Sequence, residues 1–294
     1  MIGSTSQAHA LIKIVFPAIM LTNRWTENCE REVKNVAIVG GTHGNELHGI
    51  HLVGEINSDV RAQELKAEFP GLNIVGVVGN LAAAAAIGTG AGRRYCEEDL
   101  NRCFLLQDLE NPDLLSTERA RAKELDLLLG PKSSPDPKTD LILDFHSTTS
   151  NTGILLCCHP QDAFALQLVT FLQSRYQKIS VSLWSDCEVP LLPTIARSGI
   201  TVEVGPISHS TSNSALYQET KRILLDALYY TELHNLWIAQ CRSSGLDKRS
   251  LCLQPTKMRL FERFATIGYP RNYAGAYKVL TEIRSLLRYR SLNI

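Results

Sequence analysis

Residues 36–46 read VAIVGGTHGNE, and this stretch decides the fold class and the first candidate site. The apolar run at its start is typical of a short buried strand, the paired glycines end that strand, and residues 46–55 have helical rather than alternating character. His43 and Glu46 therefore lie where a strand gives way to a helix. Because residues i and i+3 share a face in a first helical turn, an imidazole and a carboxylate can bind one metal ion there without backbone strain.

A third metal ligand must come from elsewhere in the chain, and His146 is the best candidate. It ends a second apolar run, LILDFH at residues 141–146, which stops in a polar cluster at residues 147–151. Two histidines and one carboxylate with an open position form a catalytic zinc pattern. An H-x-x-E pair also occurs by chance, and glycines after a strand can form a phosphate-binding turn. The phosphate alternative is weaker, because the chain has no G-x-G-x-x-G and no G-x-x-x-x-G-K-[ST] motif.

Strand-like and helix-like stretches alternate along the chain. Strand-like runs fall near residues 36, 74, 141, 154, 179 and 201, and helix-like runs fall near residues 46, 117, 163 and 216. Such alternation favours an α/β fold with helices on both faces of a sheet. In open sheets of this kind ligands bind at the strand ends, which is where the candidate residues fall.

Four ordered motifs resemble the aspartoacylase and aminoacylase-3 family of zinc amidohydrolases: GGTHGNE at 40–46, DLNR at 99–102, DFHSTTSN at 144–151 and VEVGP at 202–206. The resemblance runs from about residue 36 to about residue 230, with a weaker echo, GYPR, at 268–271. It implies a zinc-carboxypeptidase-like mixed sheet with helices on both faces. It also implies hydrolysis of N-acyl amino acids, such as N-acetylaspartate, to a carboxylate and a free amino acid.

The resemblance further assigns roles to individual residues. It implies one Zn²⁺ per subunit held by His43, Glu46 and His146, and it makes Glu203 the general base. The alternative for Glu203 is an ordinary solvated carboxylate at a strand end.

Three more residues match family positions near the site. By resemblance Arg94 polarises the scissile carbonyl, and Asn101 with Arg102 binds the substrate, since a guanidinium can hold a carboxylate through two hydrogen bonds. The alternatives are a solvated charge for Arg94 and an Asp99–Arg102 pair that caps a helix. Asp144 precedes His146 by two residues, so both project to one face of a strand, where Asp144 can orient the histidine or serve as an ordinary buried hydrogen-bonding group.

The segment upstream of Glu203 limits the substrate prediction. Aspartoacylases carry an arginine there that meets the side-chain carboxylate of the substrate, whereas residues 189–194 here read VPLLPT. Arg197 is nearby, but its use would require a shifted loop. Because an unpaired buried carboxylate costs several kcal/mol, roughly, the sequence also supports a deacylase of neutral or aromatic N-acyl amino acids.

The C-terminal part departs from the family. Relatives continue after the Tyr-Pro-Arg echo into a small β-rich domain, whereas residues 278–289 have apolar residues at helical spacing. We expect an N-terminal extension at residues 1–34, a catalytic domain at 35–236 and a shortened C-terminal region at 237–294. This last region would be a truncated appendage to the catalytic domain. A zinc-binding member with impaired catalysis is therefore a further interpretation, because a missing cover would weaken substrate binding and the exclusion of water.

Composition bounds the partners. The chain has 294 residues, 44% of them hydrophobic, and its 30 basic and 30 acidic residues give no attraction to nucleic acid or acidic membranes. Its eight cysteines show no C-x-x-C spacing, which indicates reduced thiols in the cytoplasm. The apolar stretch at residues 10–21 is too short to span a membrane. We expect a cytoplasmic enzyme that binds a small N-acyl amino acid and has no nucleic-acid or membrane partner. A homo-oligomer is compatible with the sequence.

Overall fold

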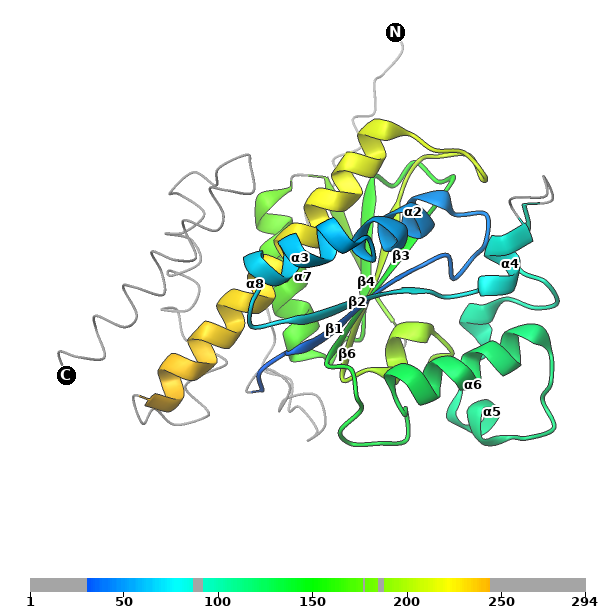
Figure 1. Cartoon of the computed structure of the whole chain (residues 1–294), viewed down its shortest axis with the longest axis horizontal. Helices are drawn as coiled ribbons and strands as arrows, with labels where there is room; N and C mark the ends of the chain where they lie inside the picture. Colours follow the sequence, from blue (N-terminus) through cyan, green and yellow to red (C-terminus); the bar gives the residue numbers. More distant parts are fainter. Residues whose placement is uncertain (1–30, 87–91, 177, 185–187, 244–294) are drawn as a thin grey trace, which may run out of the picture.

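The computed structural model describes residues 31–86, 92–176, 178–184 and 188–243. These residues contain one six-stranded sheet in the order β2-β1-β3-β6-β4-β5 (Figure 1). The strands lie where the sequence predicts them, and they are β1 (Asn35–Gly40), β2 (Asn73–Val78), β3 (Leu141–Ser147), β4 (Ile154–Cys158), β5 (Ile179–Leu183) and β6 (Ser198–Val204).

Strand directions make the sheet mixed. The strands β2, β1, β3 and β6 run parallel, β4 pairs antiparallel with β6, and β5 is parallel to β4. Since β3 lies between β1 and β6, the carboxyl ends of these three strands meet at one edge of the sheet. The predicted α/β fold class with a mixed sheet is confirmed.

Helices connect the strands. The described residues form α2 (Leu47–Ile56), α3 (Asp59–Glu68), α4 (Leu81–Ala85), α5 (Leu106–Glu110), α6 (Thr117–Leu129), α7 (Ala163–Arg175) and α8 (Ser214–Ser243), and the 3₁₀ helices η3 (Leu100–Arg102) and η4 (Leu192–Ile195). Their starts follow from the sequence. Ser58, Ser116 and Asp162 precede α3, α6 and α7, and each side chain accepts a hydrogen bond from a first-turn backbone N–H.

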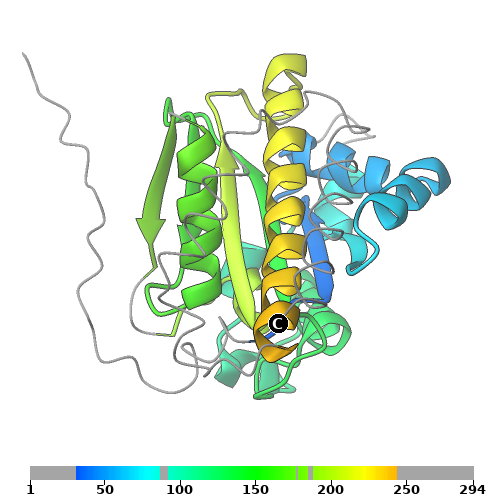
Figure 2. The ribbon, with the colours of Figure 1, turned by 90° about the vertical axis from the view of Figure 1, so that its left-hand side faces the viewer.

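Alternate residues of the strands face opposite sides of the sheet, and each side has its own core. Val36 and Ile38 of β1 belong to a cluster with residues of α2, α3, α7 and α8. Ala37 and Val39 belong to a second cluster, with residues of η3, α6 and η4. Figure 1 shows α2 and α3 on one side of the strands and α5 and α6 on the other. In Figure 2, α7 and α8 run beside each other along the strands.

Several predictions from the sequence fall outside the described residues. They concern the N-terminal extension up to residue 30, the echo at 268–271 and the helical spacing at 278–289. The domain limits stay predictions, and α8 continues through residue 236 to Ser243. Across the described part of the chain, no helix combines the length and the hydropathy needed to cross a bilayer. Cys96, Cys103, Cys157 and Cys158 are free thiols.

Candidate metal centre

The backbone conformation of the loop between β1 and α2 depends on glycine. Gly41 has a φ of +68°, a conformation that residues with a Cβ rarely adopt. A Cβ on Gly44 would lie 2.4 Å from the backbone of Ala83, so only glycine lets this loop pack against α4. The Glu46 backbone N–H then donates to the His43 carbonyl (3.1 Å), which closes a turn just before α2. This local geometry turns the His43 and Glu46 side chains toward each other, as their spacing predicts.

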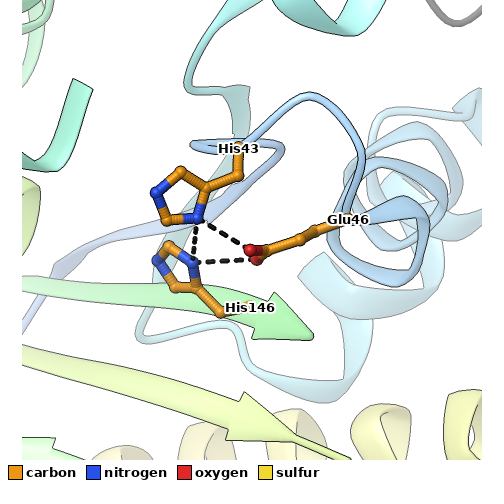
Figure 3. A group of neighbouring side chains, drawn as sticks. All are labelled: His43, Glu46 and His146. Atoms are coloured by element: carbon orange, nitrogen blue, oxygen red, sulfur yellow. Dashed lines mark hydrogen bonds and ion pairs between the residues drawn. The ribbon is translucent and has the colours of Figure 1, made fainter. Parts of the chain in front are cut away.

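His146 reaches the same point from β3. Its Nδ1 lies 3.1 Å from His43 Nδ1 and 2.9 Å from Glu46 Oε2, and His43 Nδ1 lies 2.8 Å from Glu46 Oε1. Figure 3 shows the three side chains converging from the loop, the start of α2 and the end of β3. All three are buried, with 2–4% of their surface exposed. The structure thus brings together the three residues that the sequence predicts as metal ligands.

The triangle of ligand atoms fits a zinc ion. Tetrahedral zinc with bonds of about 2.0–2.1 Å separates its ligands by about 3.3 Å, slightly more than the distances in this cluster. Each histidine also has its other nitrogen against a carboxylate: His43 Nε2 lies 2.9 Å from Asp99 Oδ1, and His146 Nε2 lies 2.8 Å from Asp144 Oδ2. A proton on each Nε2 leaves both Nδ1 lone pairs directed at the centre, where a bound metal cation would relieve their repulsion.

Charge balance also favours a divalent cation. The carboxylates of Glu46, Asp99 and Asp144 bring three negative charges to the two histidines, and Arg94 brings one positive charge, 3.1 Å from Glu46 Oε1. Although burial opposes ionisation, His146 and His43 hold the pKa of Glu46 well below its usual range. A zinc ion would supply the two missing positive charges. The residues present therefore fit this metal.

The pKa of His146 also reflects the excess negative charge of the site. Burial alone would lower its pKa, but Asp144 and Glu46 raise the pKa well above the ordinary value. The Glu46 carboxylate is further fixed by the Ser147 backbone N–H, which donates to Oε2 (3.0 Å). The carboxylate position is thus set by the backbone of β3 as well as by the histidines.

Glu203 lies beside the cluster on β6. In the parallel register of β3 and β6 it is the partner of His146, so both side chains project from the same face of the sheet. Its side chain is partly exposed. Burial raises the pKa of Glu203, and the negative charges of Glu46 and Asp144 act in the same direction, against the opposing effect of the two histidines.

Arg94 borders the cluster from the segment between α4 and η3. Its Nη1 donates to Glu46 Oε1 (3.1 Å) and its Nη2 lies 3.5 Å from Asp99 Oδ2, while 41% of the side chain stays exposed. Although burial opposes ionisation, His43 is the main partner that holds the pKa of Asp99 well below its usual range. Arg94 thus contacts both the cluster and solvent.

Asn101 and Arg102 occupy different environments. Asn101 is buried against the outer side of His146, with Nδ2 3.3 Å from its Nε2, and its Oδ1 accepts a hydrogen bond from the Leu192 backbone N–H (3.0 Å). Arg102 is exposed and donates to the Asn101 carbonyl (2.7 Å). The structure gives Arg102 no ion pair with any described acidic residue, Asp99 included. Asp99 does cap η3, since its side chain accepts from the Asn101 backbone N–H (2.9 Å).

Comparison with known proteins assigns the family. Residues 32–228, more than half of the chain, match the succinylglutamate desuccinylase/aspartoacylase catalytic domain. The chain belongs to this family. A probable aspartoacylase from Nostoc sp. is 32% identical over 245 residues, which cover 83% of this chain and 76% of that protein. An N-acyl-aromatic-L-amino acid amidohydrolase (carboxylate-forming) from Homo sapiens is 30% identical over 252 residues, covering 83% of this chain and 71% of its own length.

A solved structure agrees with this assignment. The crystal structure of murine aminoacylase 3 matches with a TM-score of 0.60 and 31% identity, covering 70% of this chain and 66% of that one. The family predicted from the four motifs is confirmed. As a member of this family, the protein is a hydrolase that acts on acyl amino acids.

Other parts of this family member correct or extend the view from the sequence. The contact of Asp144 with His146 is the one that their spacing on a strand allows, and the Thr42 hydroxyl holds the second oxygen of Asp144 (2.7 Å). The bond from His43 to Asp99 was not predicted, because nothing local links two residues 56 positions apart. His48, in α2, is buried, and its Nε2 accepts from the Asn213 backbone N–H (3.0 Å).

Proposed function

We propose that this protein is a zinc-dependent amidohydrolase that cleaves N-acyl amino acids to a carboxylate and a free amino acid. One zinc per subunit would be held by His43 Nδ1, His146 Nδ1 and the Glu46 carboxylate. The observation that carries the proposal is the orientation of the two histidines: each has its Nε2 against a carboxylate, so both Nδ1 atoms point to one position beside Glu46. Zinc bound there would act as a Lewis acid toward the amide carbonyl and would activate a water molecule.

Glu203 would move the proton. As a carboxylate it takes a proton from the attacking water while the new C–O bond forms, and it returns that proton to the nitrogen when the C–N bond breaks. Its register opposite His146 and its partial exposure support this role, because the group must be near the ligands and also reachable by substrate. The raised pKa of Glu203 suits a group that both accepts and donates a proton.

Arg94 would stabilise the charge that develops on the carbonyl oxygen. Its guanidinium contacts Glu46 and Asp99 on one side and is 41% exposed on the other, so it can donate to a substrate oxygen without leaving the site. Removing one donor of this kind from other hydrolases lowers kcat by about 10²–10³-fold.

Arg102 and Asn101 would bind the carboxylate of the amino acid. The guanidinium of Arg102 is exposed and unpaired among the described acidic groups, which leaves it available to an anionic substrate. Asn101 has its carbonyl oxygen engaged by Leu192, so only its amide nitrogen could serve as a substrate donor. We therefore assign Arg102 the larger share of carboxylate binding.

A specific observation favours substrates less acidic than N-acetylaspartate. Arg197, the cation nearest in sequence to the position of the missing arginine, pairs with Asp140 (2.5 Å) and Asp136 (2.6 Å) and is 14% exposed. It precedes β6, so it lies at the opposite end of that strand from Glu203. A neutral or aromatic N-acetyl amino acid, which needs no second cation, is the second candidate substrate class.

The test measures zinc content and turnover in one preparation. Metal analysis should give one zinc per chain, and hydrolysis of N-acetylaspartate is compared with that of N-acetyl derivatives of neutral and aromatic amino acids. Glu203→Gln should keep zinc and lose turnover, whereas Glu124→Gln, which removes an exposed carboxylate on α6, should keep both. Zinc bound with no turnover on any substrate would instead support the interpretation of a metal-binding member with impaired catalysis.

A further inference from the structure

Glu118 is a buried carboxylate that no step of the proposed reaction uses. It lies in the first turn of α6, and its exposed fraction is 0%. Its Oε1 accepts from Asn80 Nδ2 (2.9 Å) and from the Cys96 backbone N–H (2.6 Å). Its Oε2 accepts from the backbone N–H groups of Glu97 (3.1 Å) and Glu98 (3.3 Å). One side chain thus binds three successive backbone N–H groups of a distant segment.

The segment that Glu118 binds is also tied to α6 through a side chain of its own: Ser116 Oγ donates to Glu98 Oε1 (2.5 Å), and Arg119 Nε donates to both Glu98 oxygens (3.1 and 3.0 Å). Residues 92–99 form neither helix nor strand, so the backbone N–H groups of residues 96–98 have no partner within a regular element and are bound by Glu118 instead. Successive backbone N–H groups form an anion-binding concavity, and here the anion is the Glu118 carboxylate. Although burial opposes ionisation, these hydrogen bonds hold the pKa of Glu118 below its usual value. The carboxylate therefore stays charged and is matched to this concavity.

The same segment carries two groups of the candidate site. Arg94 lies two residues before the three bound N–H groups, and Asp99 follows them directly. Arg94 also accepts, through its carbonyl, a hydrogen bond from the Gly44 backbone N–H (2.9 Å), next to His43. A displacement of residues 96–98 would therefore move the guanidinium away from Glu46 and the Asp99 carboxylate away from His43.

We propose that Glu118 is a positioning residue of the active site, which sets the places of Arg94 and Asp99 through the backbone of residues 96–98. The inference rests on the proposed function for its catalytic consequence. Glutamine is not equivalent, because either orientation of its amide turns an NH₂ group toward two N–H donors. A misplacement of about 1 Å can lower a rate by about 10²-fold, so Glu118→Gln should lower kcat by 10- to 100-fold.

Two measurements separate this role from a general structural one. With zinc in excess, kcat is compared for wild type, Glu118→Gln, Arg94→Ala and the double variant. If Glu118 acts through Arg94, Glu118→Gln should cost less than about threefold once Arg94 is absent. The rate of zinc release to a chelator depends on the contact between Asp99 and His43. This rate should rise about 10-fold in Glu118→Gln. Glu124→Gln, on the same helix, should match wild type in both.

Defined results would overturn the inference. Values for Glu118→Gln within twofold of Glu124→Gln in both measurements would refute it, as would an undiminished loss of kcat in the Arg94→Ala background. If Glu118→Gln does not fold, Glu118→Asp replaces it, because aspartate keeps the charge but has a shorter side chain. Glu118→Asp should then show smaller changes of the same kind in kcat and in zinc release. If it shows neither change, the inference is refuted.

Amide hydrogen exchange tests the inference without turnover or zinc. In the wild-type protein, the backbone amides of residues 96–98 should be protected to the same degree as those of α6, and exchange at the rate of an exposed loop would refute the inference. A wild-type protein that is inactive on every substrate would contradict the proposed function, while zinc release and hydrogen exchange would still decide the role of Glu118.

Discussion

Asp99→Asn tests the charge beside His43, one of the proposed metal ligands. Asp99 Oδ1 accepts from both His43 Nε2 (2.9 Å) and the Asn101 backbone N–H (2.9 Å), so an asparagine that keeps its oxygen there keeps both hydrogen bonds. Its NH₂ then replaces Oδ2, which lies 3.5 Å from Arg94 Nη2. The substitution therefore removes the negative charge and a long ion pair, and it leaves the shape of the site unchanged.

The magnitude follows from the change in that hydrogen bond. A bond to a charged group contributes roughly 1.5–3 kcal/mol and one between neutral groups roughly 0.5–1.5 kcal/mol. The middle values of these ranges differ by about 1.3 kcal/mol, which corresponds to a nearly tenfold change in an equilibrium constant. Because 19% of the Asp99 side chain is exposed, solvent limits the effect. We expect the zinc dissociation constant to rise about 10-fold, with the thermal stability of the metal-free protein changed little.

The assay is competition for zinc with a chromophoric chelator at fixed pH and ionic strength. Asp59→Asn, which removes an exposed carboxylate from the first turn of α3, is the matched control and should bind zinc as wild type does. An affinity within twofold of wild type would show that the Asp99 charge does not support His43. A loss greater than about 10³-fold would show that Asp99 is itself a ligand, and either result would refute the reasoning.

Three other predictions follow from the same structure. Asp144→Asn should weaken zinc binding more than Asp99→Asn does, because Asp144 is fully buried. We expect its zinc dissociation constant to rise about 100-fold in the same assay. A rise equal to or smaller than that of Asp99→Asn would contradict this. Burial raises the pKa of Glu68 from 4.5 to about 7, so its contribution to stability is present below about pH 4.5 and is lost as pH rises through about 7. Urea unfolding should therefore show Glu68→Gln gaining up to about 3 kcal/mol relative to wild type between about pH 5 and about pH 8, whereas parallel pH profiles would exclude the effect. Because the Glu203 base must be ionised and its pKa is raised, kcat/KM should fall on the acid side at a pH above that of an ordinary glutamate, about 4.3; an acid limb at the ordinary value would count against Glu203.

The convergence of the three proposed ligands could be predicted because their geometry is local. His43 and Glu46 are three residues apart at a turn, and His146 ends a strand that the apolar pattern of the sequence predicts. Asp99 and Glu118 could not be predicted in this way. Each acts through a partner more than 20 residues away, and such contacts depend on how segments pack rather than on spacing.

The order of the strands was likewise beyond the local pattern. Apolar runs predict that residues 154–158 form a strand, but an apolar run is the same for a parallel and an antiparallel neighbour. In the structure β4 pairs antiparallel with β6. That pairing places Leu155 directly opposite Glu203, so the residue beside the proposed base is set by tertiary structure alone.

The two halves of the proposed metal-binding triad lie about a hundred residues apart in the chain, one in the loop that follows β1 and the other on the adjacent strand β3. The unfolded chain therefore has no compact ligand set to capture an ion, unlike a zinc finger, whose ligands are close in sequence and whose folding requires the metal. We therefore expect β1 to pair with β3 first, so that zinc would enter a preformed site. Expression in zinc-poor medium should consequently yield folded protein that can be loaded afterwards, with whichever divalent metal is supplied at that stage.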